Sequence, residues 1–216
     1  MLGETLALAG IVALALGGLA TANIAFDKGI DAAFTRRVPG VLGGVAFLMA
    51  VLWLSPWTAT GVALAVTLGM LIAKLRFRRG LRGVSGSLSP QAWAEITYPL
   101  AGAVSLAVGW GLLEDRLLAF LPIAFMAWGD SVSGLTRDVL LRRGTVPRSW
   151  PLIGMLLTCL ALATLIEPYW IGALGAVVAT VSERYSPRIN GVRDDNWLTV
   201  VGSLGVMVIP SLLLGA

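Results

Sequence analysis

The chain has 216 residues, of which 57% are hydrophobic and only 13% are charged. Soluble domains carry about a quarter charged residues, so this composition excludes an ordinary soluble globular protein. The net charge is +4, histidine is absent and Cys159 is the only cysteine, which together exclude an internal disulfide, a cysteine metal cluster and any site built on histidine.

Eight apolar stretches follow one another along the chain, separated by short polar gaps. A hydrocarbon core about 30 Å thick requires roughly 20 helical residues per span, and eight such spans with their loops use up the sequence. The stretch nearest the N-terminus lacks a basic leading region, so we expect a retained span rather than a signal peptide. The stretches are 5–26, 38–54, 57–73, 94–113, 117–136, 149–166, 169–183 and 197–215.

The predicted fold class is therefore all-α. We expect a polytopic transmembrane helix bundle of about eight spans that forms a single integral membrane domain over residues 1–216. The stretch 169–183 is short for a span, so it is expected to be tilted, broken or re-entrant. Re-entry of this stretch would reduce the number of spans to seven.

The basic residues of the gaps predict the orientation of the bundle. All but one of the sixteen Lys and Arg residues lie in the first, third, fifth and seventh gaps, and the exception is Arg116. Because basic residues collect on cytoplasmic loops, both termini are expected outside and the unusual polar motifs on the cytoplasmic side. A prokaryotic plasma membrane is the simplest location. Nucleic acid is not an expected partner, because the basic residues are divided among loops without interleaved aromatic residues.

The first polar motif is the Gly/Ser/Arg segment Arg79–Ser87, followed by Glu95 in the first turn of the fourth stretch. Such a loop can surround a phosphate with backbone N–H groups. It is not a P-loop, however, and an ordinary flexible loop has the same composition. The helix dipole also favours a carboxylate in a first turn, so this segment alone leaves both interpretations open.

The second motif lies at the predicted cytoplasmic end of the fifth stretch. At 100° per residue, Asp130, Gly134 and Arg137 share one helical stripe, on which bare backbone admits a phosphate and a guanidinium binds its oxygens. Ionisable residues inside a span usually mark function, but a simple ion pair between Asp130 and Arg137 is the alternative. Asp138 lies about 12 Å further along the axis than Asp130, too far to share a metal ion unless the helix breaks. Arg142 and Arg143 follow.

The third motif comprises Glu183 and the run Asp194–Asn196, just before the last stretch. Consecutive carboxylates beside an amide suit Mg²⁺, which takes oxygen ligands and commonly holds nucleotide phosphates. Asp and Asn are also favoured at a helix N-terminus, but a cap requires only one of them. The run therefore favours a metal site over a cap.

Together the motifs place several carboxylates and arginines on one face of the membrane. This combination is what phosphoryl transfer requires: phosphates held by a metal and by cations, and a positioned oxygen nucleophile. With histidine missing, a hydroxyl nucleophile would depend on a carboxylate base. The apolar bundle indicates that the acceptor arrives from the bilayer.

The order and spacing of these motifs over roughly residues 74–200 resemble the polyprenol kinase family. That family includes dolichol kinase and phytol kinase, and it is related to the CDP-diacylglycerol synthases. The archaeal dolichol-kinase-like branch looks most similar. The matching segments are Glu95–Pro99, Gly129–Arg137 with Arg142 and Arg143, Glu183, and Asp194–Thr199.

The resemblance implies a Mg²⁺-dependent kinase that transfers phosphate from CTP to the hydroxyl of an isoprenoid alcohol. It implies catalytic roles for Asp130, Glu183 and Asp195. The metal would be held by Asp130, Asp194 and Asp195. The residues expected to contact nucleotide and phosphates are Glu95, Gly134, Arg137, Asp138, Arg142, Arg143 and Asn196.

Two other functions fit the same motifs. A CTP-dependent phosphatidate-type cytidylyltransferase also needs a metal, a triphosphate and a lipid, although its usual Lys- and Gly-rich signature is not found here. A membrane transporter ranks last, because transporter sites lie near the bilayer midplane between repeats. The expected partners are a lipid alcohol, a nucleoside triphosphate and membrane lipids, and a homodimer is left open. Where many relatives have a basic stretch ending in His, this chain has Thr35–Pro39.

Overall fold

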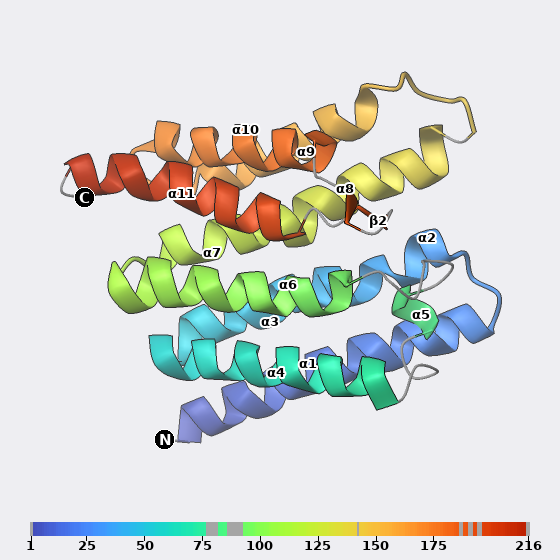
Figure 1. The fold of residues 1–216 in the computed structure, drawn as a ribbon, viewed down its shortest axis with the longest axis horizontal. Coiled ribbons are helices and arrows are strands. Elements are labelled where there is room, and N and C mark those ends of the chain that lie inside the picture. The colour runs from blue at the N-terminus through green and yellow to red at the C-terminus, as the bar shows by residue number, and fades with distance from the viewer. Residues whose placement is uncertain are drawn as a thin grey trace.

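The computed structural model describes residues 2–76, 82–85, 93–141, 143–185, 188–189, 192–193 and 196–214. These residues are almost entirely helical, and the helices lie side by side along one long axis (Figure 1). The α-helices are α1 (Leu2–Asp27), α2 (Ala32–Thr35), α3 (Arg37–Trp53), α4 (Pro56–Arg76), α5 (Arg82–Ser85), α6 (Ala94–Ser105), α7 (Arg116–Ala124), α8 (Asp130–Leu135), α9 (Trp150–Ala163), α10 (Tyr169–Tyr185) and α11 (Asn196–Leu214). The remaining elements are the π-helical segments η2 (Leu106–Leu112), η3 (Phe125–Gly129) and η4 (Thr136–Leu141), and the short antiparallel strands β1 (Arg188–Ile189) and β2 (Val192–Arg193).

The apolar stretches of the sequence coincide with the main helices of the bundle. Five helices in the described part of the chain are long and apolar enough to cross a membrane, judged by length and composition. They support a membrane helix bundle. The short stretch 169–183 lies in α10, which is one continuous helix of 17 residues. The five candidate spans are Gly3–Asp27, Ala32–Trp53, Pro56–Arg76, Arg116–Leu141 and Asn196–Leu214.

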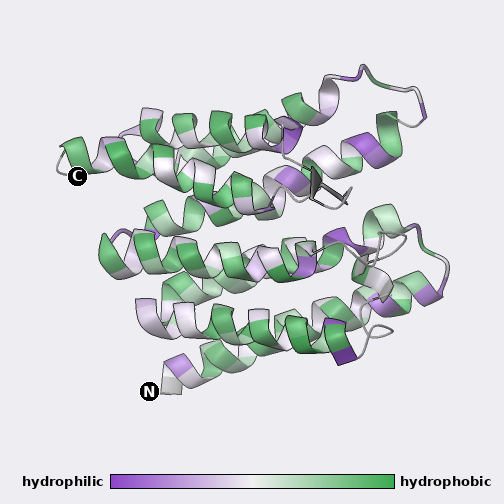
Figure 2. Cartoon of the chain, in the orientation of Figure 1, coloured by the Kyte–Doolittle hydropathy of each residue, from purple (hydrophilic) through white to green (hydrophobic). Residues whose placement is uncertain are grey.

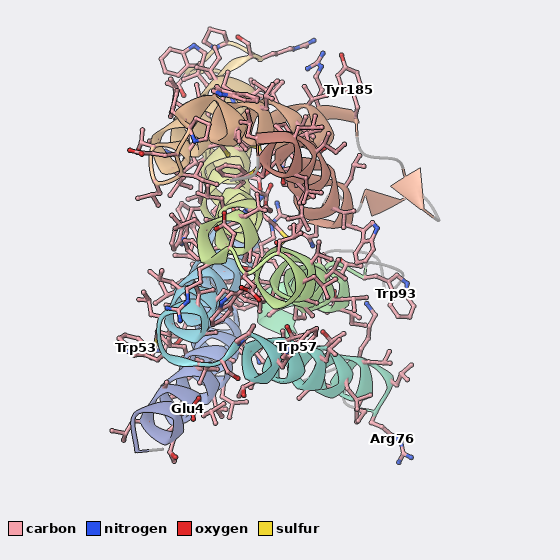
Figure 3. All side chains as sticks on the ribbon, turned by 90° about the vertical axis from the view of Figure 1, so that its left-hand side faces the viewer. Glu4, Trp53, Trp57, Arg76, Trp93 and Tyr185 are labelled. Carbon is pink, nitrogen blue, oxygen red and sulfur yellow. The ribbon has the colours of Figure 1, made fainter. Side chains whose placement is uncertain are left out.

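The helices are stacked in layers around a central rod. In the two views, α1 and α4 form one edge of the bundle and α9, α10 and α11 the opposite edge (Figures 1 and 3). The segment from α7 through η4 runs between them, and 78% of its most apolar window is buried. Apolar side chains of this rod, among them Leu121, Ile123 and Phe125, are completely inaccessible.

Small residues allow the helices of the core to approach closely. A Cβ atom on Gly102 would lie 2.3 Å from the ring of Phe47, and one on Gly109 would lie 2.6 Å from the Cα atom of Ala119. A Cβ atom on Gly129 would lie 2.6 Å from the Sγ atom of Cys159, which is buried. Such contacts are typical of membrane helix interfaces, where close packing replaces the hydrophobic driving force between helices.

The central rod is not a regular α-helix. Its wide turns, η3 and η4, lie on either side of α8, so Asp130 directly follows one and Asp138 lies within the other. Pro122 in α7 removes a backbone donor shortly before η3 begins. Isolated π-helical turns occur frequently at functional sites, because they change the direction of the side chains that follow.

Polar residues gather at one end of the bundle. Both marked chain ends lie at the opposite end, and the hydrophilic residues near α2, α5 and η4 lie far from them (Figure 2). The short helix α5 closes this polar end over α1, where the Gly83 N–H donates to Asn23 Oδ1 at 2.7 Å. The Thr35 hydroxyl donates to the Gly83 carbonyl at 2.9 Å and so joins α2 to α5.

The contact between η2 and α7 leads to a stability prediction. We expect Gly109→Ala to destabilise the fold by about 1–3 kcal/mol, because the new methyl group would overlap the backbone at Ala119 and force the helices apart. Gly61→Ala is the control, since its Cβ would meet nothing within 4 Å and alanine favours helix. Unfolding in mixed micelles titrated with dodecyl sulfate measures both. Equal midpoints for the two variants would contradict the close contact.

Candidate functional site

Arg37, at the start of α3, connects two carboxylates of the central rod. Its Nη1 atom lies 2.8 Å from Asp130 Oδ2 and its Nη2 atom lies 3.5 Å from Asp138 Oδ2. The preceding residue, Arg36, is also ion-paired with Asp138. These pairs fix the junction of α2 and α3 against α8 and η4. In the sequence, both arginines were explained by the positive charge of cytoplasmic loops, and their ion pairs with the central rod were not predicted.

Gly134 makes the approach of Arg37 to the rod feasible. A Cβ atom built on Gly134 would lie 1.7 Å from Arg37 Nη2 and 2.0 Å from its Cζ atom. The guanidinium group therefore lies directly on the glycine backbone. This is the bare patch on which the sequence predicted a phosphate, and in the structure a cation of the protein covers it.

Arg137 has a different partner from the one that the sequence alternative proposed. Its Nη1 atom lies 2.6 Å from Glu183 Oε1 of α10, while the ion-pair partner of Asp130 is Arg37. The Ser133 hydroxyl donates to the same Glu183 oxygen at 3.4 Å. Glu183 is almost fully buried, so Arg137 is ion-paired with a carboxylate that solvent barely reaches.

A second polar group joins α4, α6 and α11. Lys74 Nζ lies 2.6 Å from Glu95 Oε1 and 5.2 Å from the centre of the Trp93 ring, while the Glu95 side chain is only 3% exposed. The Asn196 amide donates to the Ala94 carbonyl at 3.1 Å and to the Thr97 hydroxyl at 3.3 Å. The beginning of α11 is thereby held beside the first turn of α6.

One cavity of about 820 Å³ connects these groups. Four residues predicted from the sequence line it, namely Glu95, Asp130, Arg137 and Asn196. Arg36, Arg37, Tyr98 and Ser131 complete its polar wall. Residues of α6, α8, η4 and α11 therefore line one cavity in the part of the chain that the structure describes.

The other predicted residues lie elsewhere. Glu183 and Asp138 stand behind the cavity and bind the arginines that line it. Arg143 is exposed in the segment before α9. Arg142, Asp194 and Asp195 lie outside the described residues, so the predicted metal ligands are represented here by Asp130 alone.

The described residues do not by themselves form a metal site. Among them, no group of three or more acidic, histidine or cysteine side chains is arranged to hold an ion. Asp130 and Asp138 each face an arginine, whose positive charge would repel a divalent cation at the same oxygen atoms. A Mg²⁺ ion would have to draw ligands from Asp194 and Asp195 as well.

The opposite part of the cavity is aliphatic. It runs between α1, α3 and α4, and those of its lining residues that the structure describes are uncharged. The cavity is therefore amphiphilic, with guanidinium and carboxylate groups at one end and hydrocarbon at the other. Its apolar lining comprises Ile11, Ala15, Leu19, Ala46, Phe47, Ala50, Ala59, Val62, Ala63, Val66 and Met70.

Comparisons of the chain with protein-family models, with curated proteins and with solved structures found no match in any of the three. The resemblance to polyprenol kinases therefore rests on the motifs alone. What the site does must be argued from its own geometry.

The ion pairs of Asp138 lead to a second stability prediction. Asp138→Asn should destabilise the fold by about 3 kcal/mol, because it leaves Arg36 and Arg37 half-buried with one carboxylate fewer. Asp115→Asn is the matched control: Asp115 caps α7 through its side chain, and Asn caps equally well. The same micelle titration applies. A shift as small as that of the control would mean that solvent screens the Asp138 pairs.

Proposed function

We propose that this protein is a membrane lipid kinase. It transfers the γ-phosphate of CTP, or of another nucleoside triphosphate, to the hydroxyl of an isoprenoid alcohol such as dolichol, polyprenol or phytol. The observation that carries this proposal is the amphiphilic cavity, in which an arginine-rich end is continuous with an aliphatic end. A reaction between an anionic donor and an apolar acceptor requires both environments within one space.

The charged end has the groups that a polyphosphate requires. Arg36, Arg37 and Arg137 line it together, and guanidinium groups bind phosphate oxygens in a two-pronged geometry. In the structure these guanidinium groups are ion-paired with Asp130, Asp138 and Glu183. A bound phosphate would compete with Asp130 for Arg37 and would release that carboxylate at the moment the donor arrives.

The released Asp130 carboxylate is the proposed general base. The acceptor oxygen forms a bond to the γ-phosphorus, and the bond between that phosphorus and the β,γ-bridging oxygen breaks. The electron pair of the broken bond leaves with the nucleoside diphosphate, and the hydroxyl proton passes to Asp130. Glu183 acts through Arg137, which it holds beside the cavity.

The cofactor proposal is Mg²⁺, held by Asp130 with Asp194 and Asp195; Asp130 would bind the ion through one carboxylate oxygen and accept the proton on the other. It rests on the acidic run and on the family resemblance, since two of the three carboxylates lie outside the described residues. Such an ion would neutralise charge on the transferring phosphates.

The topology proposal is eight spans with both chain ends outside and the charged end of the cavity facing the cytoplasm of a prokaryotic cell. Two observations support this orientation. The start of α1 and the end of α11 lie at the end of the bundle remote from the hydrophilic residues near α2 and η4 (Figures 1 and 2). The basic gaps of the sequence contain Arg36, Arg37, Lys74 and Arg137, which gather at the polar end, as cytoplasmic residues would.

The second candidate is a CTP-dependent cytidylyltransferase that acts on a lipid phosphate. It is favoured by the three arginines at the charged end of the cavity, which would also suit a phosphate already attached to a lipid. A transporter is disfavoured, because the charged lining residues Arg36 and Arg37 lie at the start of α3 rather than near its middle.

Isotope position distinguishes the two enzymes. We expect purified protein with Mg²⁺ and mixed polyprenols to incorporate label into lipid from γ-labelled CTP and not from α-labelled CTP. Label from the α-position with phosphatidate would support the cytidylyltransferase. Absence of transfer from either position, with every lipid tested, would remove both enzymes.

Substitution of Asp130, the proposed base, or of Asp195, a proposed metal ligand, should abolish transfer without unfolding the protein. We expect Asp130→Asn and Asp195→Asn each to reduce transfer at least about a hundredfold, the usual contribution of a general base or more. Asp115→Asn serves as the control, since it lies in the turn before α7. Rates are measured with γ-labelled CTP, and folding is checked by gel filtration in detergent. Transfer at the wild-type rate by Asp130→Asn would disprove the assigned role.

A further inference from the structure

We propose that the aliphatic part of the cavity binds a single hydrocarbon chain, which enters sideways from the bilayer between α1 and α4. The proposal deepens the proposed function, on which it rests, by defining where the acceptor's chain binds and how it enters. Small residues of α1 and α4 determine which chains fit.

The length of the cavity supports this occupant. On α3 its lining extends from Arg37 to Ala50, which corresponds to about 20 Å along the helix axis. The hydrocarbon core of a bilayer is about 30 Å thick. The cavity therefore covers about two-thirds of that thickness, parallel to the spans, so a lipid could bind without turning over.

The polarity of the cavity defines the direction of the chain. Its charged residues, Arg37 and Asp130, lie at one end of the α3 lining, and Phe47 and Ala50 lie towards the other. Tyr98 and Pro99 line the intermediate region, and the Tyr98 hydroxyl donates to the Gly40 carbonyl at 2.8 Å. A lipid alcohol would place its hydroxyl beside Asp130 and its chain among the aliphatic residues.

The entrance follows from how the helices pack. The main neighbours of α1 are α3 and α5, whereas those of α4 are α6 and η2, and α1 and α4 make little contact with each other. Together they form one edge of the bundle (Figure 3). Their lining residues Leu19, Val66 and Met70 are only partly buried, as expected beside an opening.

Small side chains on these two helices leave room for the chain. Ala15 of α1 and Ala59 and Ala63 of α4 each face the cavity. They recur at positions where a larger aliphatic residue would fill the space. These alanines provide the space for a hydrocarbon chain, and we expect one chain, rather than the paired chains of a diacyl lipid, to fit between them.

The test is photolabelling, because it does not require phosphate transfer. Purified protein in phosphatidylcholine vesicles is irradiated with geranylgeraniol that has a diazirine at the end remote from its hydroxyl, and adducts are mapped by mass spectrometry. We expect adducts near Ala50 and Ala59. Unlabelled geranylgeraniol should compete and diacylglycerol should not. Equal competition by diacylglycerol, or adducts spread over the outward faces of the helices, would overturn the proposal.

Matched variants test the width of the cavity. Ala63→Phe should reduce these adducts about tenfold, since it inserts a ring into the cavity, whereas Ala65→Phe, exposed on the same helix, should not. Ala15→Phe and the exposed Ala13→Phe form a second pair on α1, where the lining position is only partly buried and tolerates substitution better. Unchanged adducts in both lining variants would exclude this path.

Phosphorylation measured on the same samples separates the two proposals. Adducts in the cavity without phosphorylation would retain the chain site and remove the kinase. Phosphorylation of geranylgeraniol by the wild-type protein, with adducts indifferent to both lining variants, would retain the kinase and remove the chain site.

Discussion

The arrangement of the charged end depends on the shared guanidinium group of Arg37. Charged side chains inside an apolar helix bundle are costly unless paired, and Arg37 is paired with Asp130 and Asp138 at once. The contact is feasible only because Gly134 presents bare backbone. Since removal of one partner from a buried pair leaves an uncompensated charge, the same atoms that would bind substrate also hold α3 against α8 and η4.

The sequence predicted the helices well for a simple physical reason. Apolar stretches of sufficient length have to satisfy their backbone groups internally, and the helix is the simplest way to do so. The stripe of Asp130, Gly134 and Arg137 could also be predicted from the sequence, because residues on one helix have a fixed angular spacing. In the structure Asp130 and Arg137 both line the cavity, and Gly134 receives Arg37.

The partners of these residues could not be obtained in the same way. Arg37 precedes Asp130 by 93 positions, and no local rule connects a cation before one span with a carboxylate in another. The positive charge of Arg36 and Arg37 was already explained by membrane orientation, so nothing in the sequence indicated that Arg37 also pairs with carboxylates of the central rod. The wide turns of η3 and η4 also have no signal in the apolar pattern, although Pro122 lies shortly before η3. Similarly, the alanines of α1 and α4 give no signal until the helices that surround them are placed.

The surroundings of Cys159 have a practical consequence for spectroscopy. Its thiol is completely inaccessible within α9, and it is the sole cysteine of the chain. Reagents such as maleimides, which require an accessible thiolate, should leave the native protein unmodified. Pairs of introduced cysteines could then carry spin labels or fluorophores directly, so separations between helices can be measured without first replacing Cys159.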